Sequence, residues 1–304
     1  MEVDSGATSA RRTVRVDAPA KVNLYLHLLG RRADGLHRLD SLIVFAGVGD
    51  SVTVEAAPDL TLAVDGPFAD RLPSDDDNLV LRAARFLAEA FGSDNRTGAT
   101  IRLTKRLPVA AGVGGGSADA AATLLALMRL WKIRPGEKQL DRIALMLGAD
   151  LPVCLAGSPC FVGGIGEELA PVPPLPPAHL VLVNPGVPLP TAAVFQARSG
   201  PFSEAARFAE APADAAALAA LLAARGNDLT VAACGLAPAV AAMLAALDAT
   251  PGCLLARMSG SGATGFGLFA DAGTAAAAAR TIATAQPDWW VAAAPLLTGG
   301  RPEG

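Results

Sequence analysis

A glycine-rich segment that runs directly into an alanine-rich stretch is the feature that most constrains this chain. Residues 107–121 read LPVAAGVGGGSADAA and contain four closely spaced glycines, Gly112, Gly114, Gly115 and Gly116. Because glycine has no Cβ atom, the backbone can approach a ligand closely and point successive N–H groups at it. The helix predicted after the loop adds unpaired amides and a positive dipole end. Together these features favour an anion such as a nucleotide phosphate.

The order of residues in this loop does not fit two common phosphate-binding motifs. No Gly-Lys-Ser/Thr follows the glycines, as a Walker A loop requires, and Ser117 stands where GxGxxG needs its third glycine. Ser117 could cap the following helix or contact phosphate and metal, and the two roles are compatible. A glycine-rich turn before a helix is also a common structural feature, so the functional interpretation needs other residues.

A second glycine cluster, MSGSGATG at residues 258–265, lies far downstream between apolar runs. By itself it favours a tight hairpin or a close strand crossing. In combination with the first loop, it suggests two backbone walls around a polyphosphate.

The periodicity of apolar residues predicts a mixture of strands and helices. Alternation indicates strands at residues 14–28, 41–45, 51–55, 60–64, 99–103 and 179–184. Helical spacing indicates helices at residues 78–91, 117–131 and 137–147. Two or three alanine-rich helices follow residue 184, ahead of a last glycine-rich turn between likely strands. Gly49 and Asp50 are interpreted as a turn between two of the strands. Because the elements show no regular βα alternation, the pattern favours an α+β fold.

The run PVPPLPP at residues 171–177 is the best candidate for a joint between domains, because such a sequence is stiff and extended. We expect two domains, residues 1–165 and 166–304. Residues 1–12 and 300–304 are expected to be frayed tails.

Composition and charge limit the classes of protein to consider. Hydrophobic residues make up 52% and charged residues 18% of the chain, which is a globular composition, and the net charge of −4 argues against nucleic acid as a partner. The charge-free run 229–247 is interrupted by Gly235 and Pro238, which favours two short buried helices over a membrane span. The first residues lack the apolar run of a secretory signal, and the four cysteines form no CxxC pair. We therefore expect a cytoplasmic protein with reduced thiols and no membrane partner.

Several polar residues stand in apolar surroundings and are candidates for chemistry. Lys21 lies in the strand-like sequence APAKVNLYL, and Asp150 lies in LGADLPV just beyond a predicted helix end. Asp34 and His37 lie in the polar turn RRADGLH. Each has an ordinary structural explanation: a solvated edge lysine, a turn or cap aspartate, and a plain turn. Their order along the chain carries more information than any one of them.

Three separated segments together resemble the GHMP kinase superfamily: PAKVNL at 19–24, LPVAAGVGGGS at 107–117 and MSGSGA at 258–263. Within that superfamily, the chain resembles the kinases of a cytidine diphosphate-linked methylerythritol. The segments that narrow the choice are RADGLH at 32–37, GADLP at 148–152, NPGVPLPT at 184–191 with Phe195, and NDL at 227–229. They keep the family's order, so the resemblance spans nearly the whole chain.

The resemblance implies a two-domain α+β GHMP kinase fold with the active site in the cleft between the domains. It implies ATP and Mg²⁺ as cofactors and a small molecule, the cytidine diphosphate-linked methylerythritol, as substrate. The γ-phosphoryl group would be transferred to the 2-hydroxyl, giving the 2-phosphate and ADP, in the non-mevalonate route to isoprenoid precursors. A monomer or weak homodimer is expected.

The resemblance also implies roles for individual residues. Asp150 would accept the hydroxyl proton, and Lys21 would lie close to that base and to the hydroxyl. The residues implied to contact ATP are Pro108, Val109, Ala110, Ala111, Gly112, Val113, Gly114, Gly115, Gly116, Ser117 and Ala118 in the loop, and Lys105 and Asn78 at the adenine site. The residues implied on the substrate side are Asn23, His37, Asp150, Thr191 and Phe195. Of these, His37 would read the cytosine edge and Phe195 would stack on the ring, while Ser117 is the one candidate metal ligand.

Two positions depart from the family pattern. Leu36 stands where a tyrosine commonly forms the other face of a cytosine sandwich. Because stacking contributes about 1–3 kcal/mol per base, we expect an altered substrate affinity and an unchanged reaction. Ala118 replaces a serine that often follows Ser117, which affects phosphate and metal contacts but leaves the backbone cradle.

Three alternatives remain open at this point. Another GHMP kinase, acting on homoserine, mevalonate or a sugar, is the nearest, and a decarboxylase of the same superfamily is weaker. The turn DGLH and the segment NPGVPLPT with Phe195 favour the cytidine-linked substrate over the acceptors of another GHMP kinase. A nucleotide-binding regulator without catalysis is the third alternative, and the presence of both Lys21 and Asp150 argues against it.

Overall fold

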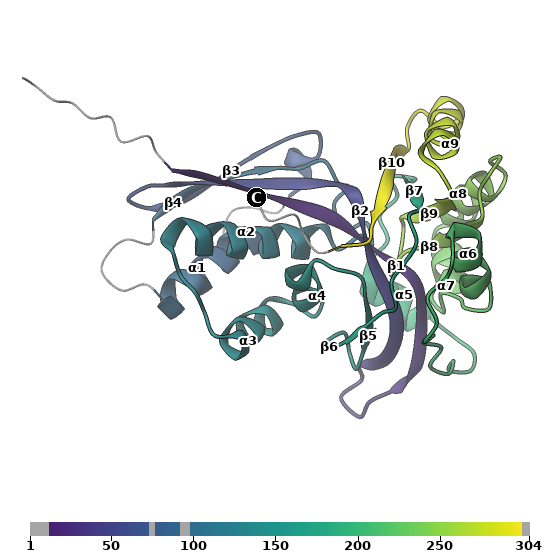
Figure 1. The fold of residues 1–304 in the computed structure, drawn as a ribbon, viewed down its shortest axis with the longest axis horizontal. Coiled ribbons are helices and arrows are strands. Elements are labelled where there is room, and N and C mark those ends of the chain that lie inside the picture. The colour runs from purple at the N-terminus through teal and green to yellow at the C-terminus, as the bar shows by residue number, and fades with distance from the viewer. Residues whose placement is uncertain (1–11, 73–76, 92–97, 300–304) are drawn as a thin grey trace, which may run out of the picture.

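The computed structural model describes residues 12–72, 77–91 and 98–299. Two long antiparallel strands, β1 (Thr13–Arg31) and β2 (His37–Ala56), run through the molecule and connect its two halves (Figure 1). The remaining strands are β3 (Leu60–Asp65), β4 (Ala99–Thr104), β5 (Cys160–Gly163), β6 (Glu168–Pro171), β7 (His179–Asn184), β8 (Leu255–Met258), β9 (Gly265–Phe269) and β10 (Trp290–Leu297). The main sheet has the order β3-β4-β2-β10-β7-β9-β8, with β1 and β5 also paired to β2. The observed mixture of helices and sheet is the predicted α+β class.

The predicted strand at residues 14–28 is confirmed as β1, but the two predicted strands at 41–45 and 51–55 are one continuous strand, β2. Gly49 is therefore not part of a turn. A Cβ atom at Gly49 would lie 2.2 Å from the carbonyl oxygen of Ala18, and the pairing of β1 with β2 shifts register just after that point, between Pro19 and Ala20. The glycine permits a close approach of two strands at a bulge, which local sequence does not distinguish from a turn.

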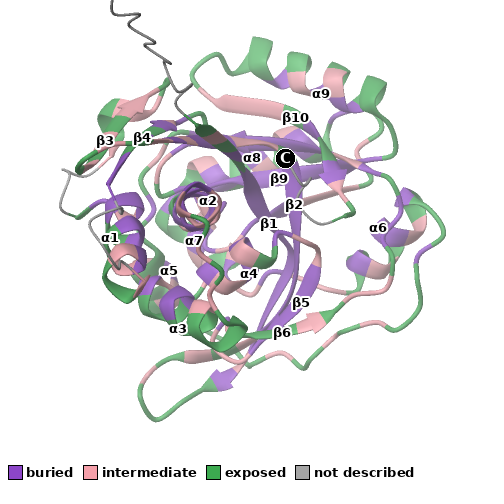
Figure 2. Ribbon diagram, turned by 60° about the vertical axis from the view of Figure 1, so that its left-hand side comes forward, coloured by how far each residue is buried: buried purple, intermediate pink, exposed green. Residues whose placement is uncertain are grey.

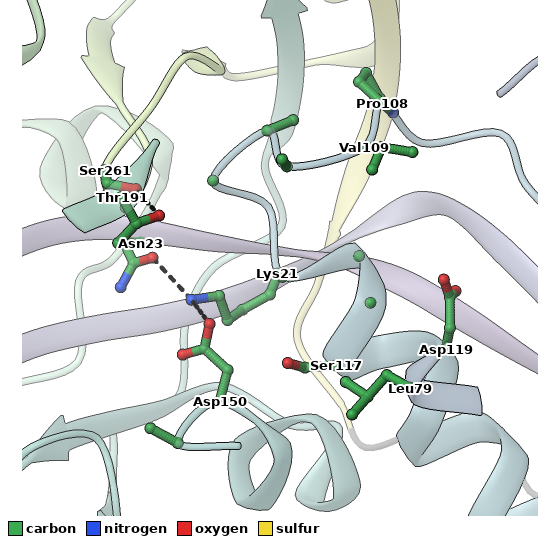
Figure 3. Close-up of a pocket in the computed structure, with 18 of the residues that line it drawn as sticks. Lys21, Asn23, Leu79, Pro108, Val109, Ser117, Asp119, Asp150, Thr191 and Ser261 are labelled. Carbon is green, nitrogen blue, oxygen red and sulfur yellow. Dashed lines mark hydrogen bonds and ion pairs between the residues drawn. The ribbon is translucent and has the colours of Figure 1, made fainter. Parts of the chain in front are cut away.

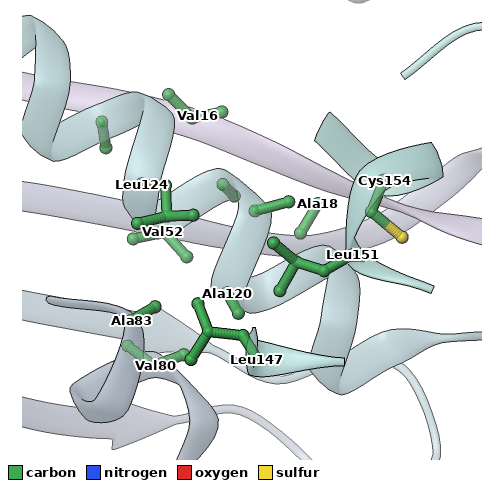
Figure 4. Packing of buried hydrophobic residues seen from close by; sticks show 14 of the residues in the cluster. Val16, Ala18, Val52, Val80, Ala83, Ala120, Leu124, Leu147, Leu151 and Cys154 are labelled. Atoms are coloured by element: carbon green, nitrogen blue, oxygen red, sulfur yellow. The ribbon is translucent and has the colours of Figure 1, made fainter. Parts of the chain in front are cut away.

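The N-terminal half packs helices against one face of the β1–β2 sheet. These are α1 (Leu79–Phe91), α2 (Gly115–Trp131), α3 (Glu137–Leu147) and α4 (Leu151–Ala156). The buried side of α2 is dominated by alanine and leucine, and Figure 2 shows this helix as one of the most buried elements. Small alanine side chains let α2 approach β1 and β2 closely, and Figure 4 shows Ala120 and Leu124 packed with Val16, Val52 and Leu151.

The C-terminal half is built on β7, β9 and β8. Its helices are α5 (Thr191–Ala197), α6 (Ala215–Ala223), α7 (Thr230–Leu236), α8 (Pro238–Asp248) and α9 (Ala272–Ala285). The predicted pair of short helices within residues 229–247 is confirmed as α7 and α8, which are separated at Ala237 because Pro238 begins the next helix. Helix α9 and strand β10 were not predicted. Among the described residues, no helix is both long and apolar enough to cross a membrane.

Strand β10 connects the two halves because its residues 290–295 pair with β7 and its last two residues pair with Phe45 and Ala46 in the middle of β2. Residue 165, the last residue of the predicted first domain, lies in the turn of the antiparallel β5–β6 hairpin, just ahead of the proline-rich run. The division into residues 1–165 and 166–304 stays a prediction. The predicted tails at residues 1–12 and 300–304 lie outside the described residues, except for Arg12.

Candidate active site

A cavity of about 630 Å³ lies where the glycine-rich loop, the middle of β1 and the start of α4 meet. Figure 3 shows Lys21 projecting into this cavity from β1, with Asp150 and Ser117 facing it. The residues that were predicted to form the site and that line the cavity are Lys21, Asn23, Asn78, Lys105, Pro108, Val109, Ala110, Ala111, Gly112, Gly114, Gly115, Gly116, Ser117, Asp150, Thr191 and Phe195. Residues predicted from five distant segments therefore surround one space.

Lys21 and Asp150 form an ion pair at the centre of the cavity. The Nζ atom of Lys21 lies 2.9 Å from Oδ2 of Asp150 and 3.2 Å from Oδ1 of Asn23 (Figure 3). The side chain of Lys21 is 6% exposed and that of Asp150 is 43% exposed, so the carboxylate keeps an open side toward the cavity. Lys21 is therefore not a solvated edge lysine. Asp150 occupies the residue before α4 but its carboxylate makes no cap hydrogen bond, so it is not a capping aspartate either.

Helix α2 begins two residues earlier than predicted, at Gly115, and its capping residue is Gly114 in the left-handed conformation. Ser117 is therefore inside the first turn and does not cap the helix, while its hydroxyl lines the cavity. A Cβ atom at Gly114 would lie 3.0 Å from Cε of Lys21, and one at Gly115 would lie 3.0 Å from Nζ of Lys105. These glycines thus allow the loop to lie directly against two lysine side chains.

The two glycine clusters pack against each other, backbone to backbone. The second cluster is the hairpin between β8 and β9, as its sequence predicted. A Cβ atom at Gly112 would lie 2.5 Å from the carbonyl oxygen of Gly262, and the Thr264 N–H donates to the carbonyl of Ala111 at 3.1 Å. The hydroxyl of Ser259 donates to the carbonyl of Gly112. The hairpin therefore forms the second wall that the sequence suggested, and Gly260 and Ser261 reach the cavity.

Sequence reasoning missed a buried triad beneath the loop. Nζ of Lys105 lies 2.5 Å from Oδ2 of Asp50 and 2.7 Å from Oδ2 of Asp119, and all three side chains are at most 2% exposed. Oδ1 of Asp50 also accepts hydrogen bonds from the backbone N–H groups of Arg106 and Leu107. The triad thus ties β2, the start of the loop and α2 together.

One ammonium faces two carboxylates in this triad, so the charges would not cancel if both carboxylates were ionised. Burial, reinforced by Asp50 and opposed by Lys105, raises the pKa of Asp119 to about 8. Burial alone would lower the pKa of Lys105, but Asp119 and Asp50 together raise it. The signal that could have pointed to Asp119 is its position as a single aspartate within the alanine run after Ser117.

The far end of the cavity is more apolar than the centre. Leu79, Val80 and Leu103 line it beside Lys105, and these hydrophobic residues were not predicted as site residues. Oδ1 of Asn78 accepts a hydrogen bond from the Val80 N–H at 2.9 Å, which holds the start of α1 against the cavity. This end offers apolar surface and a few polar groups, as a nucleobase requires.

On the opposite side, Thr191 and Phe195 project from α5. The hydroxyl of Thr191 lies 2.9 Å from that of Ser261, and the ring of Phe195 lies 5.3 Å from that of His37. His37 begins β2 beyond the cavity itself, and Leu36 beside it is 48% exposed. Burial, and then the charges of Arg31 and Arg198, lower the pKa of His37.

Three predicted site residues do not line the cavity: His37, Val113 and Ala118. Val113 is buried, and its carbonyl accepts a hydrogen bond from the backbone N–H of Lys21 at 3.0 Å. Ala118 is fully buried in the core of the N-terminal half. These two residues therefore lie on the buried side of the loop and of α2, opposite the side that lines the cavity.

Models of the GHMP kinase family match both halves of the chain. The model of the N-terminal domain of GHMP kinases matches residues 78–158, and the model of the C-terminal domain matches residues 206–288. Solved structures with low sequence identity share the fold: homoserine kinase from Cytophaga hutchinsonii aligns with a TM-score of 0.66 at 19% identity, over 97% of each chain.

Curated relatives narrow the family further. A 4-diphosphocytidyl-2-C-methyl-D-erythritol kinase from Paramagnetospirillum magneticum is 58% identical over 93% of this chain and 98% of the relative. The enzyme of that name from Rhodospirillum rubrum is 52% identical over 92% and 91%. A crystal structure of 4-(cytidine 5'-diphospho)-2C-methyl-D-erythritol kinase aligns with a TM-score of 0.77 and 35% identity, covering 94% of this chain and 100% of the other. The chain therefore belongs to the GHMP kinases and, within them, to the family of 4-diphosphocytidyl-2-C-methyl-D-erythritol kinases.

Proposed function

We propose that this protein transfers the γ-phosphoryl group of ATP to the 2-hydroxyl of 4-diphosphocytidyl-2-C-methyl-D-erythritol, giving the 2-phosphate and ADP. The reaction belongs to the non-mevalonate route to isoprenoid precursors. The observation that carries this proposal is the Lys21–Asp150 ion pair, 2.9 Å long, at the centre of a cavity bounded by the start of α2. Membership of the kinase family supports both the donor and the acceptor.

ATP is proposed to bind with its phosphates against residues 108–118 and its adenine at the apolar end. The first N–H groups of α2 have no partner within the helix and carry the positive end of its dipole, so they favour phosphate oxygens. Asn78 and Lys105 border the end that takes the adenine, together with Leu79 and Val80. This placement leaves the terminal phosphate next to Lys21, whose ammonium offsets the charge that spreads over the phosphoryl oxygens during transfer.

Asp150 is proposed to act as the general base. As the 2-hydroxyl oxygen forms its bond to the γ-phosphorus, the bond from that phosphorus to the β-phosphate oxygen breaks, and the hydroxyl proton passes to the Asp150 carboxylate. The exposed side of that carboxylate is where the hydroxyl can approach. Lys21 holds the carboxylate in place, and Asn23 in turn holds Lys21.

Mg²⁺ is proposed to enter with the nucleotide. The described residues contain no group of three or more His, Cys, Asp or Glu side chains that could hold a metal ion. Mg²⁺ commonly binds through substrate phosphates and one or two protein oxygens, and Ser117 and Asp150 face the cavity where such oxygens are needed. When bound, the ion supplies positive charge to the phosphates.

The substrate side is proposed to comprise Asn23, His37, Thr191 and Phe195. The neighbouring rings of His37 and Phe195 offer an edge and a face to the cytosine. A His37 with a lowered pKa is neutral at pH 7, so it presents one hydrogen-bond donor and one acceptor to a base.

The test is ADP release with Mg-ATP and each of three acceptors: 4-diphosphocytidyl-2-C-methyl-D-erythritol, homoserine and mevalonate. Turnover confined to the cytidine-linked acceptor is the expected result. Turnover with another acceptor alone would reject the substrate assignment and retain the kinase. The absence of turnover with all three would favour a nucleotide-binding regulator.

We further propose a cytoplasmic monomer or weak homodimer divided into domains near the proline-rich run, with neither nucleic acid nor membrane as a partner. The formal net charge of −4 supports the absence of a nucleic-acid partner. Sedimentation at several protein concentrations tests the oligomeric state, and limited proteolysis within residues 172–178 tests the joint. A stable trimer or tetramer would contradict the proposed assembly.

A further inference from the structure

An exposed phenylalanine stands beside His37, outside the hydrophobic core clusters of the described residues. Phe202 is 45% exposed, and its ring centroid lies 6.2 Å from that of His37 with the rings tilted by 54°. Phe195, on the other chain segment that approaches His37, lies 5.3 Å from it. Exposed aromatic rings that cluster around a polar side chain are typical of recognition sites, because rings at the surface contribute little to a buried core.

The segment 198–210 that carries Phe202 has no helix or strand, but it is anchored to the sheet at several points. The Ser203 N–H donates to the carbonyl of Leu28 at 2.9 Å, and the Ser203 hydroxyl donates to Oδ1 of Asp228 at 2.9 Å. Nδ1 of His27 lies 2.9 Å from the carbonyl oxygen of Glu204. The two residues that follow Phe202 are therefore fixed against β1 or its neighbours.

A buried carboxylate anchors the next part of the same segment. Asp40, 1% exposed, accepts hydrogen bonds from the Ala206 N–H, from Nε of Arg207 and from the Tyr25 hydroxyl, each at 2.8 Å. Burial, and then the neighbouring Asp40, raise the pKa of Tyr25, so its hydroxyl stays a donor. A segment held by buried, satisfied hydrogen bonds presents its side chains in fixed positions.

One face of the Phe202 ring is covered by Arg198. The guanidinium carbon lies 4.5 Å from the ring centroid, and the guanidinium itself donates to the carbonyl groups of Gly200 and Pro201. The cation thus fixes the ring from one side, and the exposed fraction of Phe202 leaves surface for a second planar group.

We infer that Phe202 provides an aromatic contact for the cytosine ring next to Phe195 and His37, and that it determines substrate affinity in this chain. The inference rests on the proposed function, which places the cytosine at His37. It also accounts for how a site with Leu36 in place of an aromatic residue retains a stacking partner. The segment 198–210 is then a rigid support for part of the substrate pocket.

The test is steady-state kinetics of the full chain with Mg-ATP and the cytidine-linked acceptor. Phe202→Ala should raise KM for that acceptor about tenfold, leave kcat within about twofold, and leave KM for ATP unchanged, because stacking binds the ground state and the transition state equally. Phe202→Tyr should retain the wild-type KM, and Phe202→Leu should fall between the two. Leu145→Ala, at a leucine of similar exposure on α3, is the matched control and should match the wild type.

Equilibrium binding of CDP and UDP, with the ATP site filled by a non-hydrolysable analogue, separates stacking from edge recognition. Phe202→Ala should weaken both nucleotides by the same factor, because a ring face does not distinguish cytosine from uracil. An unchanged KM for the acceptor in Phe202→Ala, or weaker binding of CDP alone, would overturn the inference. The proposed function would still hold in that case, provided that the wild-type protein turns over the acceptor. A failure of the wild type to use the acceptor would overturn both.

Discussion

At the scale of single residues, the lysine and the aspartate of the cavity differ from ordinary surface residues in what their atoms contact. Lys21 is almost completely buried, yet its ammonium has Asp150 and Asn23 as partners. Asp150 stands where a capping aspartate would stand, but it turns away from the backbone of α4. A buried ammonium with an open carboxylate beside it is an arrangement suited to transferring a proton next to a phosphoryl group.

Asp150→Asn is expected to reduce kcat by about 10²–10⁴-fold, because the amide cannot accept the hydroxyl proton. Binding of ATP should change little, since the amide keeps the shape of the side chain and the loop is untouched. Single-turnover kinetics with a parallel measurement of ATP affinity checks this prediction. A kcat equal to that of the wild type would remove Asp150 from the role of base.

At the scale of elements, the missing Cβ atoms of the glycine-rich loop leave room for the two lysine side chains and the hairpin backbone that pack against it. Gly114 lies over Lys21, Gly115 over Lys105, and Gly112 against the backbone of the second hairpin. The glycine pattern therefore satisfies packing as well as the proposed anion binding. Both purposes require the same missing Cβ atoms, which is why the sequence alone could not separate them.

Gly114→Ala is expected to destabilise the protein by about 1–3 kcal/mol and to reduce kcat. Its φ of 61° disfavours a side chain, and the new Cβ would press on the Lys21 stem. Urea unfolding and kinetics of the same preparation check both parts. The control is Gly235→Ala in α7, where a Cβ meets nothing within 4 Å, so stability and activity should be kept. Equal behaviour of the two variants would contradict this account of the loop.

The Asp50–Lys105–Asp119 triad predicts a pH dependence of stability. The folded state holds a proton on Asp119 up to about pH 8, whereas the unfolded chain releases it near pH 4. The free energy of unfolding therefore contains a contribution from this proton that is complete below about pH 4 and is lost as the pH rises through about 8. Asp119→Asn should remove this loss, which is at most about 1.4 kcal/mol per pH unit for one proton. Urea unfolding at pH 5, 6, 7 and 8 measures the difference.

The matched control for the triad is Asp17→Asn, at a carboxylate that is 75% exposed. Its unfolding free energy should keep the wild-type pH dependence. If Asp119→Asn also kept that dependence, Asp119 would be ionised throughout this range and the excess charge would be balanced elsewhere.

At the scale of the whole molecule, the halves are joined by β1, β2 and β10 and by one buried guanidinium. Arg257 of β8 is 9% exposed and donates to the carbonyl groups of Leu24, Leu222 and Arg225, residues from distant parts of the chain. Burial, and then the charge of Arg225, lower the pKa of Arg257 to about 10. The guanidinium compensates for its burial through these three carbonyl acceptors.

Arg257→Met is expected to lower the unfolding free energy by about 2–4 kcal/mol, because it leaves buried carbonyl groups without donors. Arg102→Met is the control, since its side chain is 63% exposed and its ion pair with Asp65 is a surface contact, so the change should stay within about 1 kcal/mol. Thermal and urea unfolding of both variants make the comparison. Similar losses in both variants would show that the carbonyl contacts contribute little.

The sequence by itself determined the fold class, the family, and most of the cavity. Periodicity placed β3, β4, β7, α1 and α3 within one or two residues of their bounds, because these elements follow local patterns of burial. The motif segments identified Lys21, Asp150 and the loop because their residue types are unusual for their local surroundings. Family membership is confirmed by the relatives, while the individual roles of the site residues stay predictions.

Only the tertiary structure decided which polar residues meet. Asp50 was interpreted as part of a turn and Asp119 was not singled out, yet both contact Lys105 across separations of 55 and 14 residues. Likewise, the position of Phe202 beside His37 depends on bonds between residues 198–210 and β1. Local sequence encodes conformation and burial periodicity, whereas partners brought together by strand register and helix packing leave no local signal, and those contacts set the charge and shape of the site.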